Sequence, residues 1–215
     1  MNIIYFLSGP PRTAKTTIMN SLITEKKVQL IAADAIEHGL RNVLTGEPHQ
    51  MLRHIEINGT AEHKASLTEG GEHKPFSNSG TESELVLQMV IGMLDYYHRN
   101  MESAAFEGTD FSPSWVSSLN VPGFAIKVAY VGYTDASHIE AILAHAKNNE
   151  HDWINDWLQN ESGDETKIRN WVKEQAVKCN QLKLEAESHG YPFFDISTQA
   201  FEDYKSSVLS HFLQS

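Results

Sequence analysis

The sequence has almost no cysteine, no long apolar run and no excess of basic residues. Cys179 is the only cysteine in 215 residues, which excludes an internal disulfide and leads us to expect a reduced, cytoplasmic setting. The apolar run at residues 2–7 is too short for a membrane span, and no basic segment precedes it, so we expect neither a signal peptide nor a membrane anchor. A net charge of −11 argues against a nucleic-acid partner held by a basic face.

Zinc-type spacing is also missing. The chain holds 11 histidines, but those between residues 45 and 81 are irregularly spaced and match no zinc pattern (His49, His54, His63 and His73). We find no internal repeat and no low-complexity segment. The bulk composition, 40% hydrophobic and 21% charged, is ordinary for a globular protein of one domain.

Strand-like and helix-like segments alternate along the chain, which is typical of parallel βαβ units. We expect strands at residues 2–7, 28–33, 103–106, 124–131 and 193–197. We expect helices at residues 17–22, 35–44, 82–101, 112–119, 135–146, 150–187 (broken at 162–164) and 201–213. The sequence therefore predicts one α/β domain over residues 1–215, with about five mainly parallel strands and helices on both faces.

Residues 45–81 differ from the rest of the chain. Glycines, histidines and charged residues dominate this segment, and its apolar residues are scattered. A structureless loop of that length is uncommon inside a compact domain. We interpret the segment as an inserted lobe or a cover over a substrate.

The segment GPPRTAKT, residues 9–16, lies between the first expected strand and the first expected helix. It resembles the Walker A motif of P-loop NTPases, G-x-x-x-x-G-K-[ST], in the strand–loop–helix context that the motif requires. Ala14 stands where that motif has its last glycine, and its methyl group would crowd a bound phosphate. The alternative is a plain helix N-terminus capped by Thr13 or Ser8.

The chemistry of such a loop explains its residue types. Backbone N–H groups and the positive end of the helix dipole bind phosphate, with Gly9 allowing the tight turn. Lys15 would reach the β- and γ-phosphates, and the Thr16 hydroxyl would bind Mg²⁺. The predicted nucleotide-binding residues are Gly9, Pro10, Pro11, Arg12, Thr13, Ala14, Lys15, Thr16 and Thr17.

The segment AADAIEHGLR after the second strand sharpens the resemblance. Together with the loop it is similar to small P-loop kinases, in the branch of the 2-phosphoglycerate kinase-like, zeta-toxin-like and polynucleotide kinase-like proteins. The resemblance implies that Asp34 is the catalytic base or a substrate ligand and that Arg41 binds the substrate. Asp34 could instead be an N-cap of the following helix, and Arg41 a solvated charge.

Two further positions follow from the same resemblance. It implies that Glu107, after the third strand, binds the Mg²⁺ water or orients the acceptor, with Asp110 as the second candidate. It also implies a helical lid at residues 150–170 that closes over the phosphates, with Arg169 as its cation and Lys167 and Lys173 as lesser candidates. A surface turn at 107–110 and a solvated charged face are the respective alternatives.

The expected function is transfer of the γ-phosphoryl group of ATP, with Mg²⁺, to a hydroxyl of a small-molecule acceptor. The catalytic residues would be Lys15, Asp34 and Arg169; Asp34, Arg41 and Glu107 would bind the substrate, and Thr16 and Glu107 the metal. One rival is a nucleotide-binding switch or ATPase without phosphotransfer, which Ala14 keeps open. Another is a kinase of nucleic-acid ends, which the net charge opposes.

Overall fold

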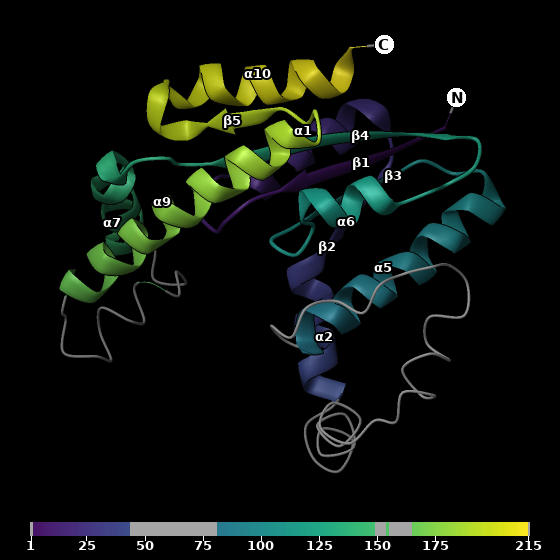
Figure 1. Cartoon of the computed structure of the whole chain (residues 1–215), viewed down its shortest axis with the longest axis horizontal. Helices are drawn as coiled ribbons and strands as arrows, with labels where there is room; N and C mark the ends of the chain where they lie inside the picture. The colour runs from purple at the N-terminus through teal and green to yellow at the C-terminus, as the bar shows by residue number, and fades with distance from the viewer. Residues whose placement is uncertain (1, 44–80, 149–153, 155–164, 215) are drawn as a thin grey trace.

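A five-stranded, fully parallel sheet forms the centre of the molecule (Figure 1). The computed structural model describes residues 2–43, 81–148, 154 and 165–214. The strands are β1 (Asn2–Ser8), β2 (Gln29–Ala32), β3 (Ala104–Gly108), β4 (Phe124–Gly132) and β5 (Phe193–Asp195). Their order in the sheet is β2-β3-β1-β4-β5. The predicted α/β class and the parallel arrangement are confirmed.

Helices cover both faces of the sheet (Figure 1). One face packs against α1 (Lys15–Lys26), α7 (Ile139–Lys147) and α10 (Phe201–Leu213). The other packs against α2 (Ala33–Val43), α5 (Thr81–Asn100) and α6 (Pro113–Ser118). Because both faces are covered, the middle strands are apolar without alternation, and Ile4, Tyr5, Phe6 and Leu7 of β1 are all buried.

The long helix α9 (Glu165–Ser188) belongs to both halves of the core. Its first part contributes Ile168, Val172 and Ala176 to the cluster that contains α1 and α10. Its last part contributes Ala186 to the cluster that contains α5 and α6. Two short 3-10 helices, η1 (Ala136–His138) and η2 (Ile196–Thr198), follow β4 and β5. None of the helices, within the ranges that the structure describes, is long and apolar enough to cross a membrane.

Three predicted boundaries are wrong in ways that matter for the site. Helix α2 begins at Ala33, so Asp34 lies in its first turn; it neither ends a strand nor serves as an N-cap. Strand β3 continues to Gly108, so Glu107 is a buried strand residue and not part of a surface turn. Strand β5 ends at Asp195, whose side chain caps η2. In β3, pairing with β1 and β2 overrides the turn preference of the segment at 107–110.

Three predicted features lie mostly or wholly outside the described residues. The insertion at 45–81 and the helix break at 162–164 stay predictions. Of the predicted lid at 150–170, the structure describes Ile154 and residues 165–170, and the latter form the start of α9.

The register of the central strands determines where the loop at residues 9–14 lies. Ser8 of β1 pairs with Gly108 of β3, and Leu7 pairs with Glu107. Because β1 and β3 are parallel neighbours, their carboxyl ends meet at the same edge of the sheet. That edge is where ligands bind in open α/β sheets.

Candidate functional site

Gly9 begins the loop that joins β1 to α1. Its N–H donates to the Gly108 carbonyl at 3.3 Å, which fastens the loop to the end of β3. A Cβ on Gly9 would lie 2.1 Å from the Val131 carbonyl oxygen and 2.8 Å from Val131 Cγ2. No side chain therefore fits at Gly9, which accounts for the one glycine that the loop retains.

Ala14 occupies the left-handed backbone region, with φ 57° and ψ 28°. It is the N-cap of α1, and its carbonyl accepts from the Ile18 N–H at 3.0 Å. Residues other than glycine rarely adopt this conformation, since their Cβ crowds the backbone. The departure from the Walker pattern thus costs backbone energy, in addition to the crowding by the methyl group that the sequence predicts.

The capping alternative is wrong, because no side chain caps α1. The Thr13 hydroxyl instead donates to the Pro10 carbonyl at 2.9 Å, inside the loop. Pro10 and Pro11 have no N–H group, so the donors of an anion nest must come from residues 12–17. The first N–H groups of α1 have no helical acceptor and add the positive end of the helix dipole.

Lys15 is the first residue of α1 and is only 8% exposed. Its ammonium donates to the Pro10 carbonyl at 2.9 Å, across the mouth of the loop. Burial lowers the pKa of the Lys15 ammonium, and nearby carboxylates oppose that shift, Glu107 most strongly. A cation held in this way is available to an anion that the loop amides bind.

The Thr16 hydroxyl donates to Glu107 Oε1 at 2.8 Å. Glu107 is 6% exposed on the central strand β3. Burial raises the pKa of this carboxyl, while the Thr16 hydrogen bond and the Lys15 charge lower it in part. The structure therefore brings together the two residues predicted to bind the metal, although their sequence positions are 91 residues apart.

Asp34 lies beside the end of β3, in the first turn of α2. Its neighbour Ala33 packs so closely that a Cβ on Gly108 would be 2.4 Å from Ala33 Cβ. The Asp34 side chain is exposed, and its charge acts on Lys15 and on Glu107. An accessible carboxylate thus faces the same edge of the sheet as the loop.

Arg41 and Asp110 are the other predicted site residues of α2 and of the segment after β3. Arg41 is seven residues after Asp34 in α2, which places it about 10 Å along the helix axis. Asp110 follows β3 and accepts from the Ser83 hydroxyl of α5 at 2.7 Å. Asp110 therefore links the end of β3 to α5. The carboxylate that contacts the Thr16 hydroxyl is that of Glu107.

Arg169, the predicted lid cation, lies in the first part of α9 and pairs with two carboxylates. One of its guanidinium nitrogens bonds to Glu140 of α7, and another lies 3.3 Å from Glu165. Its charge is thereby balanced by acidic side chains, and it does not line the cavity beside the loop.

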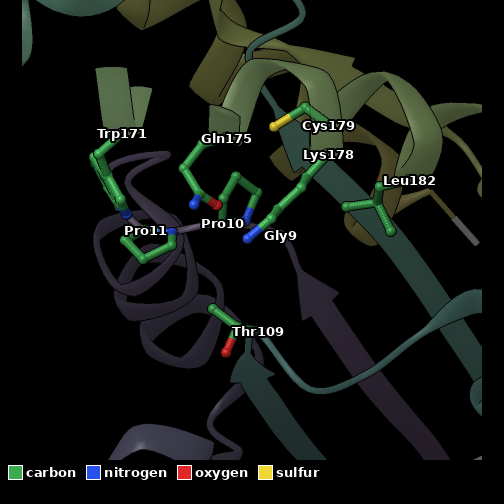
Figure 2. A pocket seen from close by; sticks show the side chains of 9 residues that line it. All are labelled: Gly9, Pro10, Pro11, Thr109, Trp171, Gln175, Lys178, Cys179 and Leu182. Carbon is green, nitrogen blue, oxygen red and sulfur yellow. The ribbon is translucent and has the colours of Figure 1, made fainter. Parts of the chain in front are cut away.

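A cavity of about 380 Å³ lies between the loop and the middle of α9 (Figure 2). Gly9, Pro10 and Pro11 form one side of it, and Thr109 lies below them. The remaining wall comes from α9 and consists of Trp171, Gln175, Lys178, Cys179 and Leu182. Figure 2 shows the Lys178 side chain extended toward Gly9 and the Gln175 amide turned toward Pro10.

Lys178 and Gln175 are polar residues that the sequence reasoning missed. The sequence does contain a pattern that could have indicated them. The i, i+4, i+7 spacing of one helix face joins Trp171, Gln175 and Lys178. The spacing alone does not tell which face of α9 meets the loop. Cys179 lines the same wall as a buried thiol whose pKa burial raises, in agreement with the inert role that the sequence suggests.

The loop between β1 and α1, the parallel sheet and the acidic end of the neighbouring strand together define the P-loop NTPase α/β fold. No family model matches this sequence, and no curated protein matches it either. Among solved structures, shikimate kinase from Bacteroides thetaiotaomicron is similar with a TM-score of 0.52 and 14% identity, over 99% of each chain. Dephospho-CoA kinase from Campylobacter jejuni gives 0.49 and 11%, over 99% of this chain and 98% of that one.

The chain thus has the fold of a small P-loop kinase, as the shikimate kinase comparison shows over the full length of both chains. At 14% identity the comparison establishes the fold and nothing finer.

Proposed function

We propose that the protein transfers the γ-phosphoryl group of ATP to a hydroxyl of a small molecule, with Mg²⁺. The observation that carries this proposal is the contact between Thr16 and Glu107 beside the buried Lys15, at the start of α1. A cation, a hydroxyl and a carboxylate around an anion nest are the groups that phosphoryl transfer requires.

The donor set suits magnesium. Mg²⁺ prefers oxygen ligands, keeps several waters and takes only one or two protein ligands when phosphates supply others. Thr16 and Glu107 offer two such oxygens within 2.8 Å of each other. When bound, the ion would neutralise charge on the phosphates.

Asp34 is the residue that we assign to the acceptor. Its exposed carboxylate would take the proton of the acceptor hydroxyl as that oxygen bonds to the γ-phosphorus. The bond between the γ-phosphorus and the bridging oxygen breaks, and ADP leaves with the electron pair. Lys15 and the loop amides stabilise the charge on the phosphates during this step, and Arg41 binds the acceptor.

Ala14 favours a second candidate, a nucleotide-binding switch or ATPase without phosphotransfer. Its left-handed backbone, with φ 57°, makes the loop costlier to form than one with glycine. A weaker loop would suit a protein that binds nucleotide reversibly and responds through a partner.

Consumption of ATP in the presence of a panel of hydroxyl compounds separates the two candidates. A kinase loses ATP faster with its acceptor and yields a phosphorylated product, visible by phosphorus NMR. We expect Asp34→Asn to lower that rate by about a hundredfold, the size of a general-base contribution, with nucleotide affinity little changed. Asp95→Asn is the matched control, because Asp95 pairs with Arg99 on the exposed side of α5. Nucleotide binding without acceptor-dependent loss of ATP would favour the switch.

We assign to Lys178 the role of the α9 cation that would bind the phosphates. It lines the cavity beside Gly9, whereas Arg169 is paired with Glu140 and Glu165. We expect Lys178→Ala to weaken Mg-ATP binding about fivefold, the effect of an exposed charge worth about 1 kcal/mol. Lys183→Ala, also on α9 but outside the cavity, should leave the affinity unchanged. A larger loss from Arg169→Ala than from Lys178→Ala, measured by calorimetry, would restore the sequence-based assignment.

A further inference from the structure

The carbonyl of Thr13 accepts a hydrogen bond from outside the loop. The donor is the hydroxyl of Tyr204, at 2.7 Å, from the first turn of α10 and 191 residues further along the chain. Tyr204 has no exposed surface, and its ring belongs to the same core cluster as Ile18 of α1. The buried Tyr204 hydroxyl therefore fixes the loop at the Thr13 carbonyl.

This point lies between two strained residues. Arg12, before Thr13, has φ 69°, and Ala14, after it, has φ 57°. Neither is a glycine, so both positions disfavour the backbone that the loop adopts. The Arg12 carbonyl is also approached from outside, by His138 Nε2 at 3.4 Å, a much longer contact than that of Tyr204.

The Thr13 carbonyl and the Ala14 N–H belong to one planar peptide group. In a trans peptide these two groups point in opposite directions, and the loop contains no cis bond. A hydrogen bond that holds the carbonyl outward therefore turns the Ala14 N–H toward the inside of the loop. That N–H is one of the donors that an anion nest uses.

We propose that Tyr204 is a positioning residue that compensates for Ala14. In the usual pattern, glycine adopts the left-handed conformation at no steric cost, and the loop needs no outside support there. In this chain the hydrogen bond from the Tyr204 hydroxyl to the Thr13 carbonyl stabilises the loop conformation instead. It keeps the phosphate-binding amides oriented. The role in binding rests on the proposed function, whereas the role in holding the loop does not.

The test is a cycle of four proteins: the native sequence, Tyr204→Phe, Ala14→Gly, and both changes together. Mg-ATP affinity is measured by calorimetry. We expect Tyr204→Phe to weaken binding about five- to tenfold in the native background, the effect of one hydrogen bond that no longer holds the binding-competent loop. In the Ala14→Gly background the same change should cost less than about twofold, because glycine forms the loop unaided.

Tyr130→Phe is the matched control. Tyr130 is also fully buried, and its hydroxyl has no hydrogen-bond partner within the described part of the chain. Removing that hydroxyl should leave the affinity unchanged in both backgrounds. An equal loss from Tyr204→Phe in both backgrounds, or no loss in either, would overturn the proposal.

Hydrogen exchange of the backbone amides of Gly9 and residues 12–17, without nucleotide, gives a second measurement that does not depend on the proposed function. Tyr204→Phe should speed exchange of these amides in the native background and leave it unchanged in the Ala14→Gly background. If this pattern holds and neither background binds Mg-ATP, the proposed function fails while the positioning role stands. If exchange is the same in all four proteins, the positioning role fails whatever the affinity.

Discussion

Lys15→Ala is expected to abolish the stabilisation that Mg-ATP gives to the protein. At about a hundred times its dissociation constant, a ligand that binds only the folded state adds roughly 2.7 kcal/mol to the free energy of unfolding. The variant should gain close to none of this, because it lacks the buried ammonium that lies at the loop, bonded to the Pro10 carbonyl. Thermal unfolding with and without Mg-ATP measures the difference.

Without nucleotide, two opposing electrostatic effects should keep the stability of the same variant close to that of the native protein at neutral pH. Burial lowers the pKa of Lys15, which means that the folded state disfavours its charged form. That cost is present as pH falls below the folded-state pKa and disappears above the ordinary pKa, where the amine is neutral in both states. Removing the ammonium removes this unfavourable contribution, and it also removes the charge that partly offsets the burial of the Glu107 carboxyl.

Lys26→Ala is the matched control for this experiment. Lys26 lies in the last turn of the same helix and is exposed. It should keep the full response to Mg-ATP. An undiminished response in Lys15→Ala, or none in the native protein, would contradict a working phosphate site.

Gly9→Ala should cause the largest loss of folding stability of any single methyl group added near the loop. The new Cβ would meet backbone, at 2.1 Å from the Val131 oxygen, and backbone cannot turn aside as a flexible side chain can. Either β4 shifts away from β1 or the loop changes its path. We expect a loss of about 3 kcal/mol or more in the free energy of unfolding, from urea titration.

Gly92→Ala is a control that should change the free energy of unfolding in the opposite direction. Gly92 lies within α5, and a Cβ there would meet nothing within 4 Å. Alanine should therefore raise stability by up to about 1 kcal/mol through its better helix propensity. A Gly9→Ala protein within about 0.5 kcal/mol of the native one, the usual range for surface changes, would show that the loop follows another path.

The sequence was sufficient to predict those parts of the site whose residues are contiguous in the chain. The apolar strand, the loop and the helix after it are contiguous, so their chemistry could be predicted without knowing the rest of the fold. The predicted pairing of Thr16 and Glu107 at one site needed the resemblance to kinases, because 91 residues separate them and no local pattern links them. The structure brings the two side chains together, and their roles stay predictions.

Other parts of the site could not be predicted, and the physical reason differs from one residue to the next. Alanine favours helix, so no propensity rule indicates the left-handed backbone at Ala14. The bond from Tyr204 to the loop depends on where α10 packs on the sheet. The resemblance to kinases implied Arg169 as a lid cation, yet acidic residues of α7 and of α9 itself pair with it. Lys178 lines the cavity because of the way α9 packs against the sheet, and that packing is not encoded in any local pattern of the sequence.

The order of the strands also affects when the proposed phosphate site can form as the chain is synthesised. Strand β1 has β3 and β4 as its neighbours and does not pair with β2, so the nascent β1 has no strand to pair with until residues 104–108 have been made. At about 5 to 20 residues per second, that delay is on the order of 5 to 20 s. During this time the apolar segment of β1 has to be kept from aggregating, and the loop beside it lacks Glu107. The loop that follows β1 is thus synthesised about 100 residues before the strand that supplies Glu107.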